Sequence, residues 1–200
     1  MFSKKDNTLK WIALITMIID HLGFYLFPSM LSLRIIGRLS LPLFIYLSAK
    51  GVSRTKSINK YLFRMGILGV ISSFITGVSP LNVMFLLFGF CLTKKFPYLH
   101  PIVAILSVFF DYGIYGYFLA IFIDYLFVKE NPNLKNIILL WLISSILMFL
   151  VVGWIQVFSL LSLAIIYLVR EIDMPKMNRW VWYAFYPVHI QVLIWISRVI

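Results

Sequence analysis

The chain has 200 residues, 62% of them apolar and 12% charged, and a formal net charge of +11. Globular domains carry about a quarter of their residues as charges, so this composition excludes an ordinary soluble domain and indicates a polytopic membrane protein. The basic residues lie between apolar segments and form no single patch, which argues against nucleic-acid binding. The single Cys91 excludes an internal disulfide.

The chain shows no linker, low-complexity tract or internal repeat, so residues 1–200 are expected to form a single integral-membrane domain. The first apolar segment is too long and carries too much charge for a cleavable signal peptide, and it is interpreted as a retained helix.

Nine apolar segments separated by turn-forming residues are predicted to cross the hydrocarbon core as helices, several of them short. In chain order they span residues 9–28, 33–49, 58–76, 81–93, 98–110, 113–128, 134–152, 154–170 and 180–198. The two short helices between residues 81 and 110 either span the bilayer or are re-entrant. The predicted fold class is an all-α transmembrane bundle of about nine helices.

Lys and Arg fall in alternate connections, as the positive-inside rule requires of a multi-pass protein. This alternation predicts a cytoplasmic N-terminus and an external C-terminus in the cell membrane. The basic residues on the predicted cytoplasmic side are Lys4, Lys5, Lys10, Lys50, Arg54, Lys56, Lys60, Lys94, Lys95, Lys129, Lys135, Arg170, Lys176 and Arg179.

Asp20 and His21 lie inside the first predicted helix, where ionisable residues are costly and usually pair or function. Adjacent helical side chains point about 100° apart, so the two residues fit the lining of a cavity better than contact with one narrow neighbour. An imidazole beside a carboxylate suits proton transfer near neutral pH. The alternative is a polar contact between helices, with a value of roughly 1 kcal/mol.

Two more ionisable residues, Arg38 and His189, are predicted at a similar depth. Arg38 lies too deep in the second helix to reach the headgroups, whereas Arg34, one turn away, lies close enough to the helix end to snorkel. His189 follows Pro187 near the middle of the last helix, where the proline permits a kink. A guanidinium held in a cavity by a carboxylate binds phosphate or stabilises an oxyanion.

Five further polar residues are predicted within helices or at their ends. Asn82, Asp111 and Gln156 are expected near outer helix ends, where they would complete one polar cluster. Arg64 and Asp124 are expected toward the cytoplasm, either as a buried ion pair or as part of a site for an anionic cofactor. The sequence contains no HExxH, GxSG, EExxxR, Walker or Rossmann motif, and no metal is expected.

Six ordered segments identify a resemblance that covers almost the whole chain. They are LKWIALITMIIDHLG at 9–23, RIIGRLSLPLFIYLSAKG at 34–51, YLFRM at 61–65, LNVMFLLFG at 81–89, DYGIYGYF at 111–118 and FYPVHIQVL at 185–193. Together they resemble the TraX family, the conjugation-associated pilin acetylases and their bacterial relatives. That family is in turn similar to integral-membrane acyltransferases that use coenzyme A.

The resemblance implies an acyltransferase-like domain over residues 1–200 in a bacterial cytoplasmic membrane, with acetyl-CoA as donor. Asp20 and His21 match the family's first-helix pair, Arg38 its GR-x-x-x-P segment, Arg64 its Y-x-x-R element, and His189 its YP-x-H element. Ser40 and Leu41 depart slightly from the family pattern. The acceptor is not implied, and a pilin-like or exported peptide and an envelope glycan both remain open.

The expected reaction is direct acetyl transfer to an amine or hydroxyl, with His21 as general base, Asp20 orienting it, and Arg38 and His189 completing the catalytic group. Arg64, Arg34, Lys50 and Lys60 are expected to bind the donor's phosphates, and Asn82, Asp111 and Tyr186 to bind the acceptor. A route through an acylated histidine stays open. The main alternative is a small transporter or proton relay, and a third is a non-catalytic immunity or assembly partner.

Overall fold

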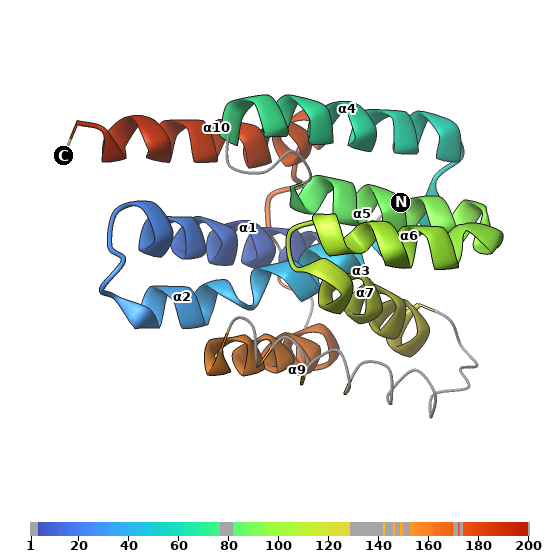
Figure 1. Ribbon diagram of the computed structural model, residues 1–200, viewed down its shortest axis with the longest axis horizontal. Coiled ribbons are helices and arrows are strands. Elements are labelled where there is room, and N and C mark those ends of the chain that lie inside the picture. Colours follow the sequence, from blue (N-terminus) through green and yellow to red (C-terminus); the bar gives the residue numbers. More distant parts are fainter. Residues whose placement is uncertain are drawn as a thin grey trace. The chain divides into compact units, whose positions relative to one another are not determined.

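The computed structural model describes residues 4–76, 82–128, 142, 146, 149, 153–169, 172 and 174–199, and Figure 1 shows its ribbon. Every regular element within these residues is a helix, so the predicted all-α fold class is confirmed for the described part of the chain. The predicted helix 134–152 lies outside the described residues except for isolated positions, as do Lys129, Lys135 and Arg170.

The helices follow the predicted segments closely. The α-helices are α1 Lys4–Tyr25, α2 Leu31–Gly37, α3 Ser40–Arg54, α4 Ile58–Thr76, α5 Val83–Lys95, α6 His100–Leu106, α7 Gly113–Phe127, α9 Leu161–Leu168 and α10 Arg179–Ser197. Short 3₁₀ helices are η1 Pro97–Leu99, η2 Ser107–Phe109 and η3 Trp154–Leu160. The predicted helix 33–49 divides into α2 and α3, and the predicted helix 154–170 begins with η3.

Two described helical stretches are long and apolar enough to cross a membrane, Leu31–Arg54 and Ile58–Ile75. Further apolar helices are shorter: Pro97–Phe109, Gly113–Phe127, Trp154–Leu168 and Val181–Ser197. The two long stretches agree with a membrane protein, whereas the predicted number of about nine crossings stays a prediction.

The chain forms two compact units, which are described separately. Unit 1 contains Met1–Leu47 and Val152–Ile200, and unit 2 contains Ser48–Val151.

Unit 1 is organised around the antiparallel pair of α1 and α2, which lie side by side in Figure 1. Two glycines permit their close approach. A Cβ atom on Gly37 would lie 2.2 Å from the Asp20 side chain, and one on Gly23 would lie 2.9 Å from Leu33 Cβ. Small residues at helix contacts are typical of membrane proteins, where backbones pack closely. The pair therefore places Asp20 directly against the end of α2.

The N-terminal part of α1 is fixed to the segment before α10. Asn7 Nδ2 donates to the carbonyls of Met174 and Pro175, both at 2.9 Å, and Asn7 Oδ1 accepts from the Met177 N–H at 3.1 Å. Trp11 Nε1 also donates to the Pro175 carbonyl at 2.9 Å. Because α10 starts just after this segment, these bonds help to hold α10 beside α1.

Unit 2 contains the pair of α4 and α5, followed by α6 and α7. Glycine again permits close packing, since a Cβ atom on Gly116 of α7 would lie 2.7 Å from Leu86 of α5. The chain enters α7 through Tyr112, which has φ 67°, and Gly113, which has φ 54°. The left-handed region favours glycine, so the Tyr112 backbone is strained at this turn.

Candidate functional site

Two histidines from opposite ends of the sequence meet in unit 1. His21 Nδ1 on α1 lies 2.8 Å from His189 Nε2 on α10, and the ring centroids are 4.8 Å apart. His189 Nδ1 lies 2.6 Å from the Phe185 carbonyl oxygen, one turn earlier in α10. Both side chains are half-buried. The structure thus brings together two of the four residues that were predicted to be catalytic.

The hydrogen-bond partners assign the tautomers of this pair. The Phe185 carbonyl can only accept, so His189 Nδ1 carries a proton. In the neutral ring His189 Nε2 is then an acceptor, and His21 Nδ1 must donate to it. His21 Nε2 consequently keeps its lone pair and is the unprotonated nitrogen of the ring.

Asp20 forms an ion pair with Arg34 of α2. Arg34 Nη1 lies 3.0 Å from Asp20 Oδ1 and also donates to the Asp20 carbonyl oxygen at 3.0 Å. Asp20 is 6% exposed, and the absence of a side chain on Gly37 makes room for its carboxylate. Arg34 was expected to snorkel or to bind the donor, and here it contacts Asp20.

Arg38, the residue just after α2, has a buried guanidinium with few partners. The residue is 8% exposed, and its Nη1 lies 3.5 Å from Gln156 Oε1 on η3, near the limit of a hydrogen bond. Within the described residues its buried Nε has no hydrogen-bonding partner. The positive charge of Arg38 also interacts electrostatically with the Asp20 carboxylate. A buried cation with an unused donor is suited to an anionic oxygen.

Aromatic side chains surround His189 and His21. The Phe185 ring stacks on the His189 ring at 4.7 Å, and the buried Tyr186 ring lies edge-on at 6.0 Å from it. The Tyr25 ring lies 6.2 Å from the His21 ring. Tyr186, which was predicted to bind the acceptor, therefore neighbours the histidine pair.

Asn82 and Asp111 meet in unit 2 at the first turn of α5. Asn82 Oδ1 accepts from the Met84 N–H at 2.9 Å, and Asp111 Oδ2 accepts from the Val83 N–H at 3.1 Å. Burial raises the pKa of the Asp111 carboxyl, while the bond from Val83 acts in the opposite direction. Both side chains satisfy backbone donors at a helix start, as capping residues do, and their role toward an acceptor stays a prediction.

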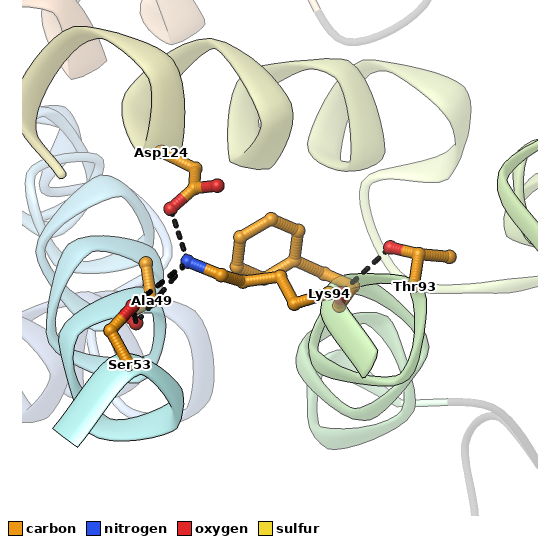
Figure 2. A network of polar contacts seen from close by, with 6 residues as sticks. Ala49, Ser53, Thr93, Lys94 and Asp124 are labelled. Atoms are coloured by element: carbon orange, nitrogen blue, oxygen red, sulfur yellow. Dashed lines mark hydrogen bonds and ion pairs between the residues drawn. The ribbon is translucent and has the colours of Figure 1, made fainter. Parts of the chain in front are cut away.

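Asp124 of α7 forms an ion pair with Lys94 of α5, which Figure 2 shows. The Lys94 Nζ atom lies 2.5 Å from Asp124 Oδ1, 3.2 Å from Ser53 Oγ and 3.5 Å from the Ala49 carbonyl oxygen. The charge pattern assigns Lys94 to the cytoplasmic side, and the predicted depth of Arg64 makes it a candidate partner of Asp124. The overlooked signal was that Lys94 and Lys95 end an otherwise uncharged helix, α5, while Asp124 is the one charge of α7.

His100, the third histidine, is not among the predicted site residues. Its Nδ1 lies 2.7 Å from Tyr117 Oη, and Tyr117 is fully buried. The contact joins the start of α6 to α7 inside unit 2. A buried tyrosine hydroxyl needs such a partner, so this pair is adequately explained by packing.

Two of the cations that were expected to bind the donor line a pocket in unit 2. The pocket has a volume of about 510 Å³, and its lining residues are Asn59, Lys60, Phe63 and Arg64 of α4. Lys50 lies on α3 and is half-buried. The four expected donor-binding cations thus divide between the units, with Arg34 in unit 1 and the other three in unit 2.

Comparison with known proteins gives one match over most of the chain. The model of a family described as TraX protein matches residues 5–197. The uncharacterized protein RP591 of Rickettsia prowazekii (strain Madrid E) is 46% identical over 41 residues, which are 20% of this chain and 16% of that protein. The match therefore spans only a small part of that relative. No solved structure gives a significant match.

Proposed function

Since the chain belongs to the TraX family, we propose that it is a membrane-embedded acetyltransferase. It moves the acetyl group of acetyl-CoA to an amine or hydroxyl of a peptide or protein N-terminus or of an envelope glycan. The observation that carries the proposal is the hydrogen bond between His21 Nδ1 and His189 Nε2, with His189 anchored on the Phe185 carbonyl. This arrangement presents a basic nitrogen on a fixed ring inside a largely apolar unit.

In this proposal His21 Nε2 is the general base. The acceptor's nitrogen or oxygen attacks the thioester carbonyl while its proton passes to His21 Nε2, a step for which general-base catalysis typically supplies about 100- to 10,000-fold. The tetrahedral intermediate then expels the coenzyme A thiolate, which takes the proton from His21. His189 Nε2 accepts the His21 Nδ1–H throughout, so His189 replaces Asp20 as the residue that orients the base.

The Arg38 guanidinium supplies the charge that opposes the oxyanion. Its Nε–H, which has no partner among the described residues, and its neighbour Gln156 favour this role, because a preorganised donor at a buried site needs no reorganisation during reaction. Arg34 is held by Asp20, so in this proposal the pair maintains the α1–α2 geometry on which both His21 and Arg38 depend.

The same proposal includes the orientation that the charge pattern predicts, with about nine crossings of the bacterial cytoplasmic membrane and the N-terminus in the cytoplasm. Acetyl-CoA then enters from the cytoplasm, and in this proposal Lys50 contributes to binding of a donor phosphate. Family membership suggests association with conjugation and pilin modification, which makes a pilin-like peptide one acceptor to test.

The direct experiment incubates purified protein with labelled acetyl-CoA and a membrane extract as the pool of acceptors. Release of coenzyme A together with a labelled product is expected, and the mass increment of one acetyl group identifies the acceptor. Labelled protein in the absence of acceptor indicates an acyl-histidine route instead of direct transfer. Ion flux into proteoliposomes without acyl donor, together with no acetyl transfer when acetyl-CoA is added, would instead indicate a transporter or proton relay.

A further inference from the structure

The pocket on α4 combines two cations with an apolar lining. Lys60 and Arg64 are one helical turn apart and therefore lie on one face, beside the Phe63 ring. Most of the pocket's surface is carbon, contributed by the ring and by the stems of the two long side chains. Such a lining fits a ligand that has both an anionic group and an apolar body.

The outer face of α4 continues from this pocket as an apolar stripe. Beyond Phe63, which is 69% exposed, the face carries Ile67, Val70, Ile71 and Phe74, all of them exposed. Their spacing of three and four residues keeps them on one side of the helix.

The opposite face of α4 is covered by α5. Leu62, Met65 and Ser72 are buried there, and Gly69 lies against the Phe85 ring. The helix Ile58–Ile75 is also one of the two described stretches able to cross a membrane. The exposed stripe thus has the length and character of a surface that meets acyl chains.

We propose that the pocket lined by Lys60 and Arg64 is a binding site for an acidic phospholipid. The lipid phosphate contacts the two cations, and an acyl chain lies along Phe63, Ile67 and the apolar residues that follow. Under the proposed orientation this site faces the cytoplasmic leaflet, where clustered basic residues attract anionic lipids.

A lipid explains this pocket better than the donor nucleotide does. The coenzyme's adenosine and phosphates are strongly polar and would leave the apolar stripe unoccupied. A phospholipid satisfies both the cations and the exposed carbon surface. Lys60 and Arg64 are therefore assigned to lipid binding instead of donor binding. This assignment holds whether or not the chain is an acetyltransferase.

The test uses the full chain, purified in detergent and titrated with phosphatidylglycerol or phosphatidylcholine while bound lipid is counted by native mass spectrometry. Wild type should retain phosphatidylglycerol preferentially. Replacing each cation with alanine should weaken that binding about fivefold, and Lys60→Ala with Arg64→Ala should weaken it about 25-fold. Lys56→Ala, an exposed cation outside the pocket, is the matched control and should change binding less than twofold.

Three results would overturn the inference: equal retention of the two lipids, a Lys56→Ala effect as large as that of the pocket variants, or displacement of phosphatidylglycerol by coenzyme A. The last result would indicate that the pocket binds the acetyl donor. The charge-conserving variant Arg64→Lys guards against misfolding, since it should keep the lipid preference that the alanine variants lose.

Discussion

At the scale of residues, three pairs of ionisable side chains join different helices in the described part of the chain. Asp20 meets Arg34, His21 meets His189, and Lys94 meets Asp124. Each contact gives a polar or charged partner to a group that would otherwise be costly in an apolar interior. The pairs differ in their remaining hydrogen-bonding capacity. The histidine pair retains an unprotonated ring nitrogen, His21 Nε2, whereas the Lys94 ammonium group donates to three acceptors.

The Lys94–Asp124 pair yields a stability prediction. Asp124→Asn leaves a buried lysine without its counter-charge and is expected to destabilise the protein by about 3–5 kcal/mol. The double variant Lys94→Met with Asp124→Leu should lose less than that, because no buried charge remains. Denaturant unfolding in detergent measures both variants. A loss for Asp124→Asn below about 0.5 kcal/mol, or a double variant at least as unstable as Asp124→Asn, would contradict the prediction.

Which residues pair could only partly be predicted from the sequence. The depth of Asp20, His21 and His189 followed from helix direction, and the last two do meet. Adjacent side chains diverge by about 100°, so depth alone does not decide which neighbour each one faces. Asp20 faces Arg34 because Gly37 lets its carboxylate approach α2, a packing detail that hydropathy does not contain.

At the scale of elements, apolar segment length and turn residues predicted the helices well. The predicted helix 58–76 has the bounds of α4, and the other described helices differ by a few residues at their ends. The division between α2 and α3, and the 3₁₀ start at η3, were not predicted because both have the composition of a continuous apolar helix.

Glycine contacts between helices give a second prediction. Gly37→Ala puts a Cβ atom within 2.2 Å of Asp20, so the α1–α2 pair must separate, at a cost of about 1–3 kcal/mol. Gly66→Ala is the matched control, because its Cβ would lie an ordinary 3.6 Å from the Phe88 ring and alanine favours helix. Thermal unfolding measures the loss of stability in each variant. The packing account is wrong if both variants behave alike.

At the scale of the whole molecule, the charge pattern predicts an orientation that labelling can test. Cys91 is buried, so the wild-type chain should react slowly with thiol reagents. In intact cells, Ser29→Cys should react with a membrane-impermeant maleimide, and Lys56→Cys should react only after lysis, since both positions are exposed. Reaction of Lys56→Cys in intact cells would contradict a cytoplasmic N-terminus.

The central claim is that His21 and His189 act together in acetyl transfer, and the rate of transfer from labelled acetyl-CoA tests it most directly. His21→Ala and His189→Ala should each lower the rate by about 100- to 10,000-fold, and the double variant should be no worse than His21→Ala, because the two residues act as one unit. His100→Gln, which alters a histidine outside the pair, should retain the wild-type rate. A folded His21→Ala protein that transfers acetyl groups at the wild-type rate would contradict the account.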